Sequence, residues 1–156
     1  MSEILDACCG SRMFYYDRNN THTVYMDNRR LNTVLCDGRT LHINPDIIGD
    51  FRNIQFENET FNVVIFDPPH LWNAGKKSWL AQKYGTLPGP IEFADYLRDG
   101  FKECFRVLKP FGVLAFKWNN EQIPFAEVIG LSPEKPLLGD KTGKTRWTIF
   151  VKGAVK

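Results

Sequence analysis

The feature that most restricts the fold is a series of short apolar segments that each run into an aspartate. The segments are EILDAC (3–8), HTVYMD (22–27), DIIGD (46–50) and FNVVIFD (61–67), and they carry Asp6, Asp27, Asp50 and Asp67. Most are apolar at successive positions, which is typical of strands covered on both faces in a parallel sheet. Because ligands of such sheets bind beyond the carboxyl ends of the strands, all four aspartates are expected at one crevice.

One aspartate at a strand end is also typical of a turn or a helix cap. Four in succession are different, because carboxylates gathered at one edge repel each other unless a ligand or a hydrogen-bond donor meets them. The series therefore indicates a shared ligand.

The rest of the chain supplies the other elements of such a sheet. GVLAFKW (112–118) predicts a fifth strand, and the apolar residues of 91–109 recur at helical spacing before Pro110 and Gly112. Residues 121–130 predict a second helix, with Pro124 in its first turn. EKPLLGD (134–140) and TRWTIFVKG (145–153) flank a turn-rich segment and predict an antiparallel hairpin. The expected fold is α/β: an open, doubly wound, mostly parallel seven-stranded sheet with a C-terminal antiparallel hairpin.

Length and composition indicate one domain, 1–156. The chain has 156 residues, 43% of them hydrophobic, and a net charge of +2. No apolar run approaches the roughly 20 residues of a membrane helix, and the first residues do not read as a signal peptide, so a cytoplasmic protein without a membrane partner is expected. The four cysteines form no C-x-x-C pair and there are three histidines, so no metal site is expected.

The segments LDACCGSR (5–12) and IGDFRNIQFENETFNVVIFDPPH (48–70) together resemble the class I S-adenosylmethionine-dependent methyltransferases over nearly the whole chain. The resemblance implies their Rossmann-like fold and S-adenosylmethionine as cofactor, although Cys8 and Arg12 stand where the family usually has glycines. By resemblance, Asp27 would bind the ribose hydroxyls and Asp50 the adenine amino group, with Phe51 beside the ring. The implied cofactor-binding set is Asp6, Ala7, Cys8, Gly10, Arg12, Asp27, Asp50, Phe51 and Asp67.

The DPPH sequence, from Asp67 to His70, resembles the fourth motif of methyltransferases that modify planar amines, in a small form similar to phage and prophage proteins. Asp67 and the Pro68 carbonyl would accept the two amino protons, and Pro68 and Pro69 would hold these acceptors rigidly. His70 stands where an aromatic ring usually stacks on the target base, a role that Trp72 would share. The resemblance thus implies transfer to an amino nitrogen of a nucleic-acid base, adenine N6 or cytosine N4.

Lysines and aromatic residues of the long connection after this motif favour nucleic acid, DNA or RNA, as a candidate partner. They are Lys76, Lys77, Trp79, Lys83 and Tyr84, although a solvated surface loop would have the same composition. Lys117, at the end of the fifth strand, resembles part of the K-D-K-E set of RNA ribose 2′-O-methyltransferases, or simply reaches solvent. A protein or small-molecule methyltransferase and an inactive cofactor-binding partner subunit also stay open, as does assembly into a homo-oligomer. A redox Rossmann enzyme is disfavoured because the G-x-G-x-x-G pattern is absent.

Overall fold

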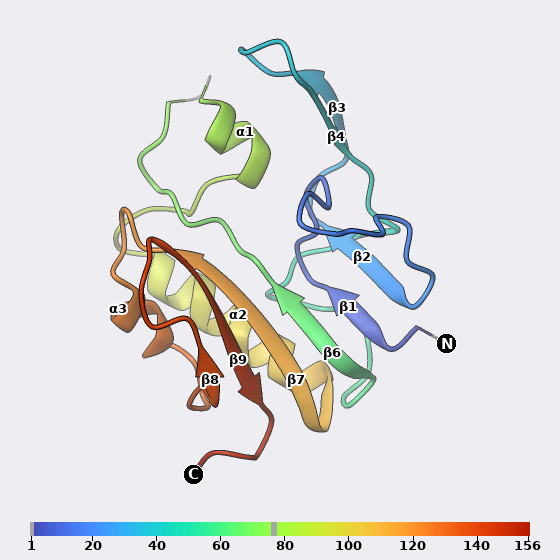
Figure 1. The fold of residues 1–156 in the computed structure, drawn as a ribbon, viewed down its shortest axis with the longest axis vertical. Helices are drawn as coiled ribbons and strands as arrows, with labels where there is room; N and C mark the ends of the chain where they lie inside the picture. Colours follow the sequence, from blue (N-terminus) through green and yellow to red (C-terminus); the bar gives the residue numbers. More distant parts are fainter. Residues whose placement is uncertain (1, 76–77) are drawn as a thin grey trace.

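A computed structural model describes residues 2–75 and 78–156, in which the predicted sheet is found (Figure 1). Among these residues seven strands form it, in the order β5-β2-β1-β6-β7-β9-β8. The first five pair in parallel, whereas β9 is antiparallel to both of its neighbours. The predicted fold class is therefore confirmed. The strands are β1 Ile4–Asp6, β2 Thr23–Asp27, β5 Ile47–Ile48, β6 Phe61–Phe66, β7 Leu108–Asn119, β8 Leu138–Gly139 and β9 Thr145–Val151.

The order of the strands reverses between β1 and β6. The chain goes from β1 outward to β2 and β5, then returns to β6 on the other side of β1 and continues outward to β7. Connections therefore leave β1 and β6 in opposite directions, and a crevice opens at the carboxyl ends of these two strands. Asp6 and Asp67 stand on either side of this switch point.

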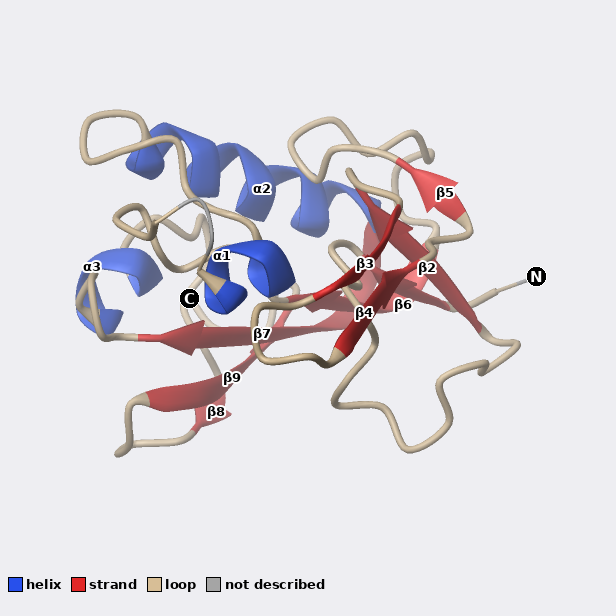
Figure 2. Ribbon diagram, turned by 90° about the horizontal axis from the view of Figure 1, so that it is seen from above, coloured by secondary structure: helices blue, strands red, loops and turns tan. Residues whose placement is uncertain are grey.

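The predicted long helix is α2, Phe93–Val107, which lies along one side of the sheet (Figure 2). Its apolar side packs on β6 and β7, and Phe101 contacts both Phe66 and Phe116, with ring centroids 5.4 and 4.8 Å apart. Fully buried aromatic side chains contribute about 1.5–3 kcal/mol each, so this cluster is a main source of stability. The second predicted helix is shorter than 121–130: α3 is Phe125–Ile129, and Pro124 precedes it with an extended backbone, ψ 139°.

The connections beside the site contain less helix than a doubly wound sheet usually has. Residues 7–22 and 49–60 form no helix. Residues 28–46 carry an unpredicted antiparallel hairpin of β3 Leu31–Val34 and β4 Thr40–Ile43. A further short helix, α1 Trp79–Tyr84, lies in the connection between β6 and α2. Both additions project beyond the carboxyl ends of the parallel strands (Figure 1).

One arginine holds the 49–60 connection in place without a helix. The Arg106 guanidinium, on α2, donates to the carbonyls of Ile54 and Phe56 at 2.7 and 2.8 Å, and also pairs with Glu103. Glu103 in turn accepts the Ile54 N–H at 2.8 Å. These bonds satisfy backbone groups that a helix would otherwise pair internally.

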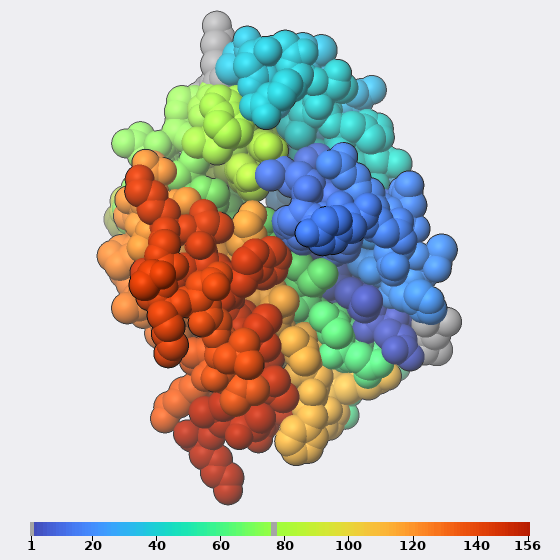
Figure 3. Space-filling view, in the orientation of Figure 1, coloured from blue at the N-terminus to red at the C-terminus, as the bar shows by residue number. Residues whose placement is uncertain are grey.

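The hairpin and α1 meet above the crevice. The Arg39 guanidinium, at the hairpin turn, lies 5.2 Å from the centre of the Trp79 ring. In the space-filling view the two segments adjoin at the top of the molecule (Figure 3). Of the described helices, none combines the length and apolar character needed to cross a membrane.

Candidate active site

A cavity of about 250 Å³ opens at the switch point and is called the cofactor cavity. The turn after β1, the end of β2, Phe51, the end of β6 and the segment after α1 all contribute to its walls. The lining residues are Ala7–Ser11, Met13, Phe14, Asp27–Arg29, Gly49, Phe51, Asp67, Pro69, Lys83–Thr86 and Tyr96.

The turn after β1 is fixed to the end of β2. Gly10 adopts a left-handed backbone, φ 49°, and its N–H donates to Oδ2 of Asp27 at 2.9 Å. A Cβ at Gly10 would lie 3.8 Å from the Lys83 carbonyl oxygen, which is an ordinary contact. The backbone conformation, rather than crowding by the protein, is therefore what favours glycine here.

Asp27 presents a nearly buried carboxylate to the cavity, with 4% of the residue exposed. Besides the bond from Gly10, its Oδ1 accepts the Arg29 N–H at 3.0 Å. A carboxylate offers about four acceptor positions, so two bonds leave capacity for a diol. The electrostatic partner is Arg29, whose Nε lies 3.6 Å from Oδ1.

Arg29 also connects Asp27 to the segment that roofs the cavity. Its Nη1 donates to the Gln82 carbonyl at 2.7 Å and its Nη2 to the Lys83 carbonyl at 3.2 Å. These are carbonyls of the last turn of α1, which lack partners within the helix. The guanidinium thus holds α1 over the cavity.

Asp67 lies in the wall between the cofactor cavity and a second cavity, and it lines both. Its Oδ2 accepts a hydrogen bond from the Lys117 ammonium at 3.3 Å, and the pair is largely buried, with 9% and 16% of the side chains exposed. Burial raises the pKa of Asp67 to about 6, and the charge and hydrogen bond of Lys117 oppose that rise. Lys117 therefore favours the ionised carboxylate near neutral pH.

The second cavity, of about 110 Å³, is here called the acceptor cavity. The rings of His70 and Tyr84 lie 5.4 Å apart in its wall, and Asn119 donates to the Thr145 hydroxyl at 3.0 Å, joining β7 to β9. Burial, with a smaller effect from Lys117, lowers the pKa of His70 to about 4, so the imidazole is neutral at pH 7. The remaining lining residues are Asp67, Leu80 and Lys117.

Of the predicted cofactor residues, Ala7, Cys8, Gly10, Asp27, Phe51 and Asp67 line the cofactor cavity, and three do not. Asp6 is fully buried and accepts the Tyr15 hydroxyl at 2.9 Å. Arg12 points away from the cavity and bonds the carbonyls of Arg18 and Asn44. The Asp50 carboxylate pairs with Arg52 at 2.6 Å.

The predicted acceptor residues are divided as well. His70 and Lys117 line the acceptor cavity, Pro69 lines the cofactor cavity, and Pro68 is buried. Trp72 packs on Phe93, with ring centroids 5.2 Å apart, and lines neither cavity. Trp79 lines neither cavity and contacts Arg39 and Lys83. Lys76 and Lys77 lie outside the described residues.

Several lining residues were not predicted from the sequence. Asn28 and Arg29 directly follow Asp27, so their place next to it in the chain was a usable signal. Met13, Phe14, Tyr96, Asn119 and Thr145 arrive from separate segments, and only the folded chain brings them together. No group of three or more acidic, histidine or cysteine side chains in the described chain is arranged to hold a metal ion.

Comparison with solved structures places the fold among known ones. The PH0226 protein of Pyrococcus horikoshii OT3 superposes with a TM-score of 0.61 at 17% identity, over 96% of this chain and 81% of that one. A SAM-dependent methyltransferase of Leishmania major superposes with a TM-score of 0.55 at 12% identity, over 96% of this chain and 65% of that one. At these identities the likeness concerns the fold. No protein-family model and no curated protein matches the sequence.

Proposed function

We propose that the chain is an S-adenosylmethionine-dependent methyltransferase that acts on an amino nitrogen of a nucleic-acid base, adenine N6 or cytosine N4. The observation that carries this proposal is the position of Asp67, which lines two adjoining cavities at the switch point of the sheet. A group held in one cavity and a group held in the other would meet beside this carboxylate. The fold, which the Leishmania methyltransferase shares, supports the same assignment.

The cofactor cavity suits a sulfonium nucleoside. Asp27 has acceptor capacity left for the two ribose hydroxyls, and the nearly buried Phe51 offers an apolar wall for a purine. The turn of Ala7–Ser11 brings backbone groups to the same cavity, where they can bind a polar amino-acid moiety. When bound, the cofactor supplies a methyl group on a cationic sulfur with a neutral leaving group.

An aromatic amine is a poor nucleophile because its lone pair is delocalised into its ring, and Asp67 would make its nitrogen more reactive. Its carboxylate would accept one amino N–H in a hydrogen bond that strengthens as the nitrogen becomes positive. Burial removes competing water, and Lys117 keeps the acceptor ionised. His70, neutral and partly buried, would contact the face or edge of the target ring beside Tyr84.

The charge of the overhanging segments supports nucleic acid as the source of the amine. Residues 68–91 contain three lysines and no acidic residue. In the described part of this segment, Lys83 lies 5.4 Å from the Trp79 ring, which Arg39 approaches from the hairpin. Cationic groups beside exposed aromatic rings suit the phosphates and bases of a single strand.

A hydroxyl acceptor is the second candidate, because the Lys117 ammonium itself contacts Asp67. The Asp67 carboxylate could take the proton of a ribose 2′-hydroxyl while the Lys117 ammonium orients the oxygen, and the resemblance to RNA ribose methyltransferases implies this use of the pair. Its chemistry differs from the first candidate in needing the Lys117 ammonium next to the reacting oxygen.

The test is a transfer assay with methyl-labelled cofactor against DNA, RNA, protein extract and metabolites, followed by digestion to the labelled atom. Label on adenine N6 or cytosine N4 supports the proposal, and label on ribose supports the second candidate. Asp67→Ala should lower turnover by at least about a hundredfold and leave cofactor affinity within a few-fold. If Asp67→Ala turned over as fast as the unchanged protein, the role of Asp67 would be wrong.

A further inference from the structure

A third opening, a cleft of about 360 Å³, adjoins the cofactor cavity on the side of the hairpin. The two share Gly10 and Ser11, so the turn after β1 forms a partition between them. One wall of the cleft is the loop that follows this turn, and the other is β4 with the residue after it. Neither the amine chemistry nor the cofactor binding proposed above uses this cleft.

The walls of the cleft are basic and polar throughout. No acidic and no apolar side chain is found among its described lining residues, which are Gly10, Ser11, Arg12, Arg18, Asn19, Thr40, His42 and Asn44. The β4 wall follows from strand alternation: Leu41 and Ile43 are buried, so Thr40, His42 and Asn44 face outward together. Such a surface offers several hydrogen-bond donors and a positive field.

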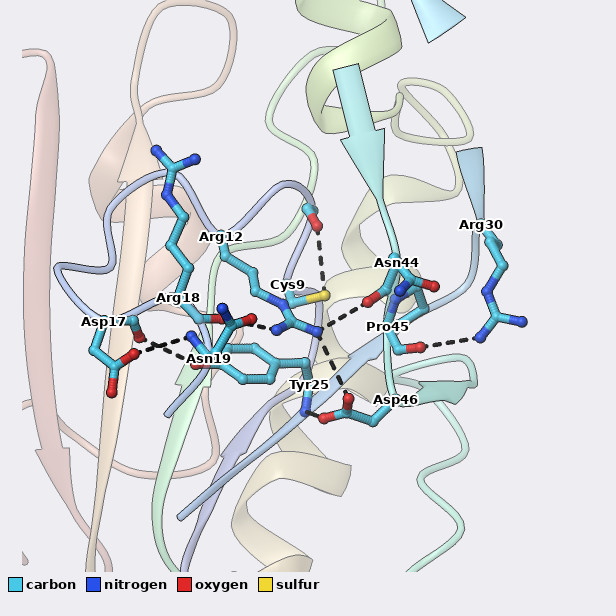
Figure 4. Close-up of polar contacts among 11 residues, drawn as sticks. Cys9, Arg12, Asp17, Arg18, Asn19, Tyr25, Arg30, Asn44, Pro45 and Asp46 are labelled. Carbon is cyan, nitrogen blue, oxygen red and sulfur yellow. Dashed lines mark hydrogen bonds and ion pairs between the residues drawn. The ribbon is translucent and has the colours of Figure 1, made fainter. Parts of the chain in front are cut away.

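Arg12 builds the cleft by joining its two walls (Figure 4). Its Nη1 donates to the Arg18 carbonyl at 2.7 Å and its Nη2 to the Asn44 carbonyl at 2.9 Å. The guanidinium also lies 3.6 Å from the centre of the Tyr25 ring, which holds it from a third side. These contacts fix the spacing of the walls before any ligand binds.

Neither of the two nearby acids, Asp17 and Asp46, lines the cleft. Asp17 turns to its own loop, where its Oδ1 accepts the Asn19 N–H at 3.1 Å. Asp46 accepts the Tyr25 N–H at 3.0 Å and lies 3.7 Å from Arg12, on the side opposite the loop. The Arg18 side chain is exposed, and in Figure 4 its guanidinium extends away from the other residues drawn, without a partner among them.

We propose that this cleft binds a phosphate group, with His42 and Arg18 as its principal contacts, the exposed Arg18 side chain turning over the cleft to reach the bound phosphate. A guanidinium matches a phosphate with paired donors, and the hydroxyl and amide groups of Ser11, Thr40 and Asn44 would complete the site. The phosphate belongs either to the strand that carries the acceptor base or to a free nucleotide. Its assignment to the acceptor rests on the function proposed above.

The test is a titration of the isotopically labelled protein, followed by amide and imidazole NMR signals. The probes are inorganic phosphate, a nucleoside 5′-monophosphate and a single-stranded oligonucleotide. Signals of Ser11, Asn19 and His42 should shift with phosphate, and Arg18→Ala should weaken binding by about tenfold. Arg98→Ala, which removes an exposed arginine of α2, is the matched control and should bind like the unchanged protein.

The probes separate the two sources of phosphate. Tighter binding of the oligonucleotide than of the monophosphate, lost in Arg18→Ala, identifies a nucleic-acid strand, whereas equal affinities identify a free nucleotide. No shift in the cleft with any probe, or equal weakening by Arg18→Ala and Arg98→Ala, overturns the proposal.

The outcome is also separable from that of the methyltransferase assignment. Phosphate binding without methyl transfer to any acceptor would leave the cleft standing and remove the proposed function. Methyl transfer to nucleic acid with an unchanged KM in Arg18→Ala would support the proposed function and remove the assignment of the cleft to the acceptor strand.

Discussion

The ammonium of Lys117 contacts Oδ2 of Asp67 at 3.3 Å, inside the wall that divides the cofactor cavity from the acceptor cavity. Asp67 directly follows β6 and Lys117 lies near the end of β7, so parallel pairing of these two strands brings them together. Burial alone would favour a protonated Asp67, and a protonated carboxyl cannot serve fully as a hydrogen-bond acceptor for an amine. The ion pair therefore controls the state of the group on which the proposed chemistry depends.

Replacing Lys117 by methionine should shift the fall of kcat/KM on the acid side of its pH profile to higher pH. Activity should fall as Asp67 is protonated, near its pKa of about 6. Since Lys117 lowers the pKa of Asp67, its loss raises that pKa, and the limb of kcat/KM moves toward neutral pH. Lys102→Met, on the exposed side of α2, is the control. A limb that stays in place or moves to lower pH would contradict the assigned role of Lys117.

Gly100 connects the packing of α2 to the cofactor cavity. A Cβ at this position would lie 2.7 Å from both Phe51 and Phe66, and Phe51 lines the cavity. Gly100→Ala should lower the free energy of unfolding by about 1–3 kcal/mol through overpacking, against a helix-propensity gain of up to about 1 kcal/mol. It should also weaken cofactor binding several-fold, because Phe51 has to shift. Denaturant unfolding and calorimetry test both, with the exposed Asp99→Ala as control.

The buried Asp6 should give the protein a distinctive dependence of stability on pH. Burial raises the pKa of Asp6 to about 7 from 3.8, so between these values the folded state holds a proton that the unfolded chain releases. The stability contributed by this proton is present below about pH 4 and is lost as pH rises through about 7. One pKa unit corresponds to about 1.4 kcal/mol, so the change can reach several kcal/mol.

Asp6→Asn isolates this effect. The lowered pKa of His70 makes stability rise with pH and so opposes the effect of Asp6, but both proteins contain His70 and its contribution cancels in their difference. The unfolding free energy of the unchanged protein minus that of the variant should fall as pH rises from 4 to 7.5. Parallel stability curves over that range would show that Asp6 does not retain its proton in the folded state.

Arg29→Ala should loosen the roof of the cofactor cavity. Without its bonds to the Gln82 and Lys83 carbonyls, amide hydrogen exchange in residues 82–86 should accelerate, and cofactor affinity should fall by about tenfold. The neighbouring Arg30 donates to the Pro45 carbonyl at 3.0 Å and not to the carbonyls of Gln82 and Lys83, so Arg30→Ala is a matched control. Equal effects of the two substitutions would indicate a general loss of charge rather than a lost roof contact.

The sheet and α2 could be predicted because their residues are apolar at successive or helical positions. The hairpin of β3 and β4 was missed although it had a signal: Asp37-Gly38 lies between two short runs, LNTVL (31–35) and TLHI (40–43), and in the second run Leu41 and Ile43 alternate with polar residues. The connection at 49–60 was not assigned, because its contacts come from Arg106, 50 and 52 residues later in the chain than the two carbonyls that it binds.

The sequence predicted which strand ends form the site, but not which of their side chains line the cavities. Asp6 is the last residue of β1 and is fully buried, whereas Ala7 and Cys8, in the turn that follows, line the cavity. The Asp50 carboxylate pairs with Arg52, and Trp72 packs on Phe93 and does not line the acceptor cavity. These choices depend on contacts between distant segments, which a linear pattern does not contain.

The central claim is that a sulfonium nucleoside binds in the cofactor cavity with its ribose on Asp27, and calorimetric titration tests it most directly. S-adenosylmethionine and its demethylated product should both bind the unchanged protein with one site per chain. Asp27→Asn should weaken both by about tenfold or more, and Asp50→Asn, which alters a carboxylate outside the cavity, should change affinity much less. No heat with either nucleoside, or binding that Asp27→Asn leaves unchanged, would contradict the account.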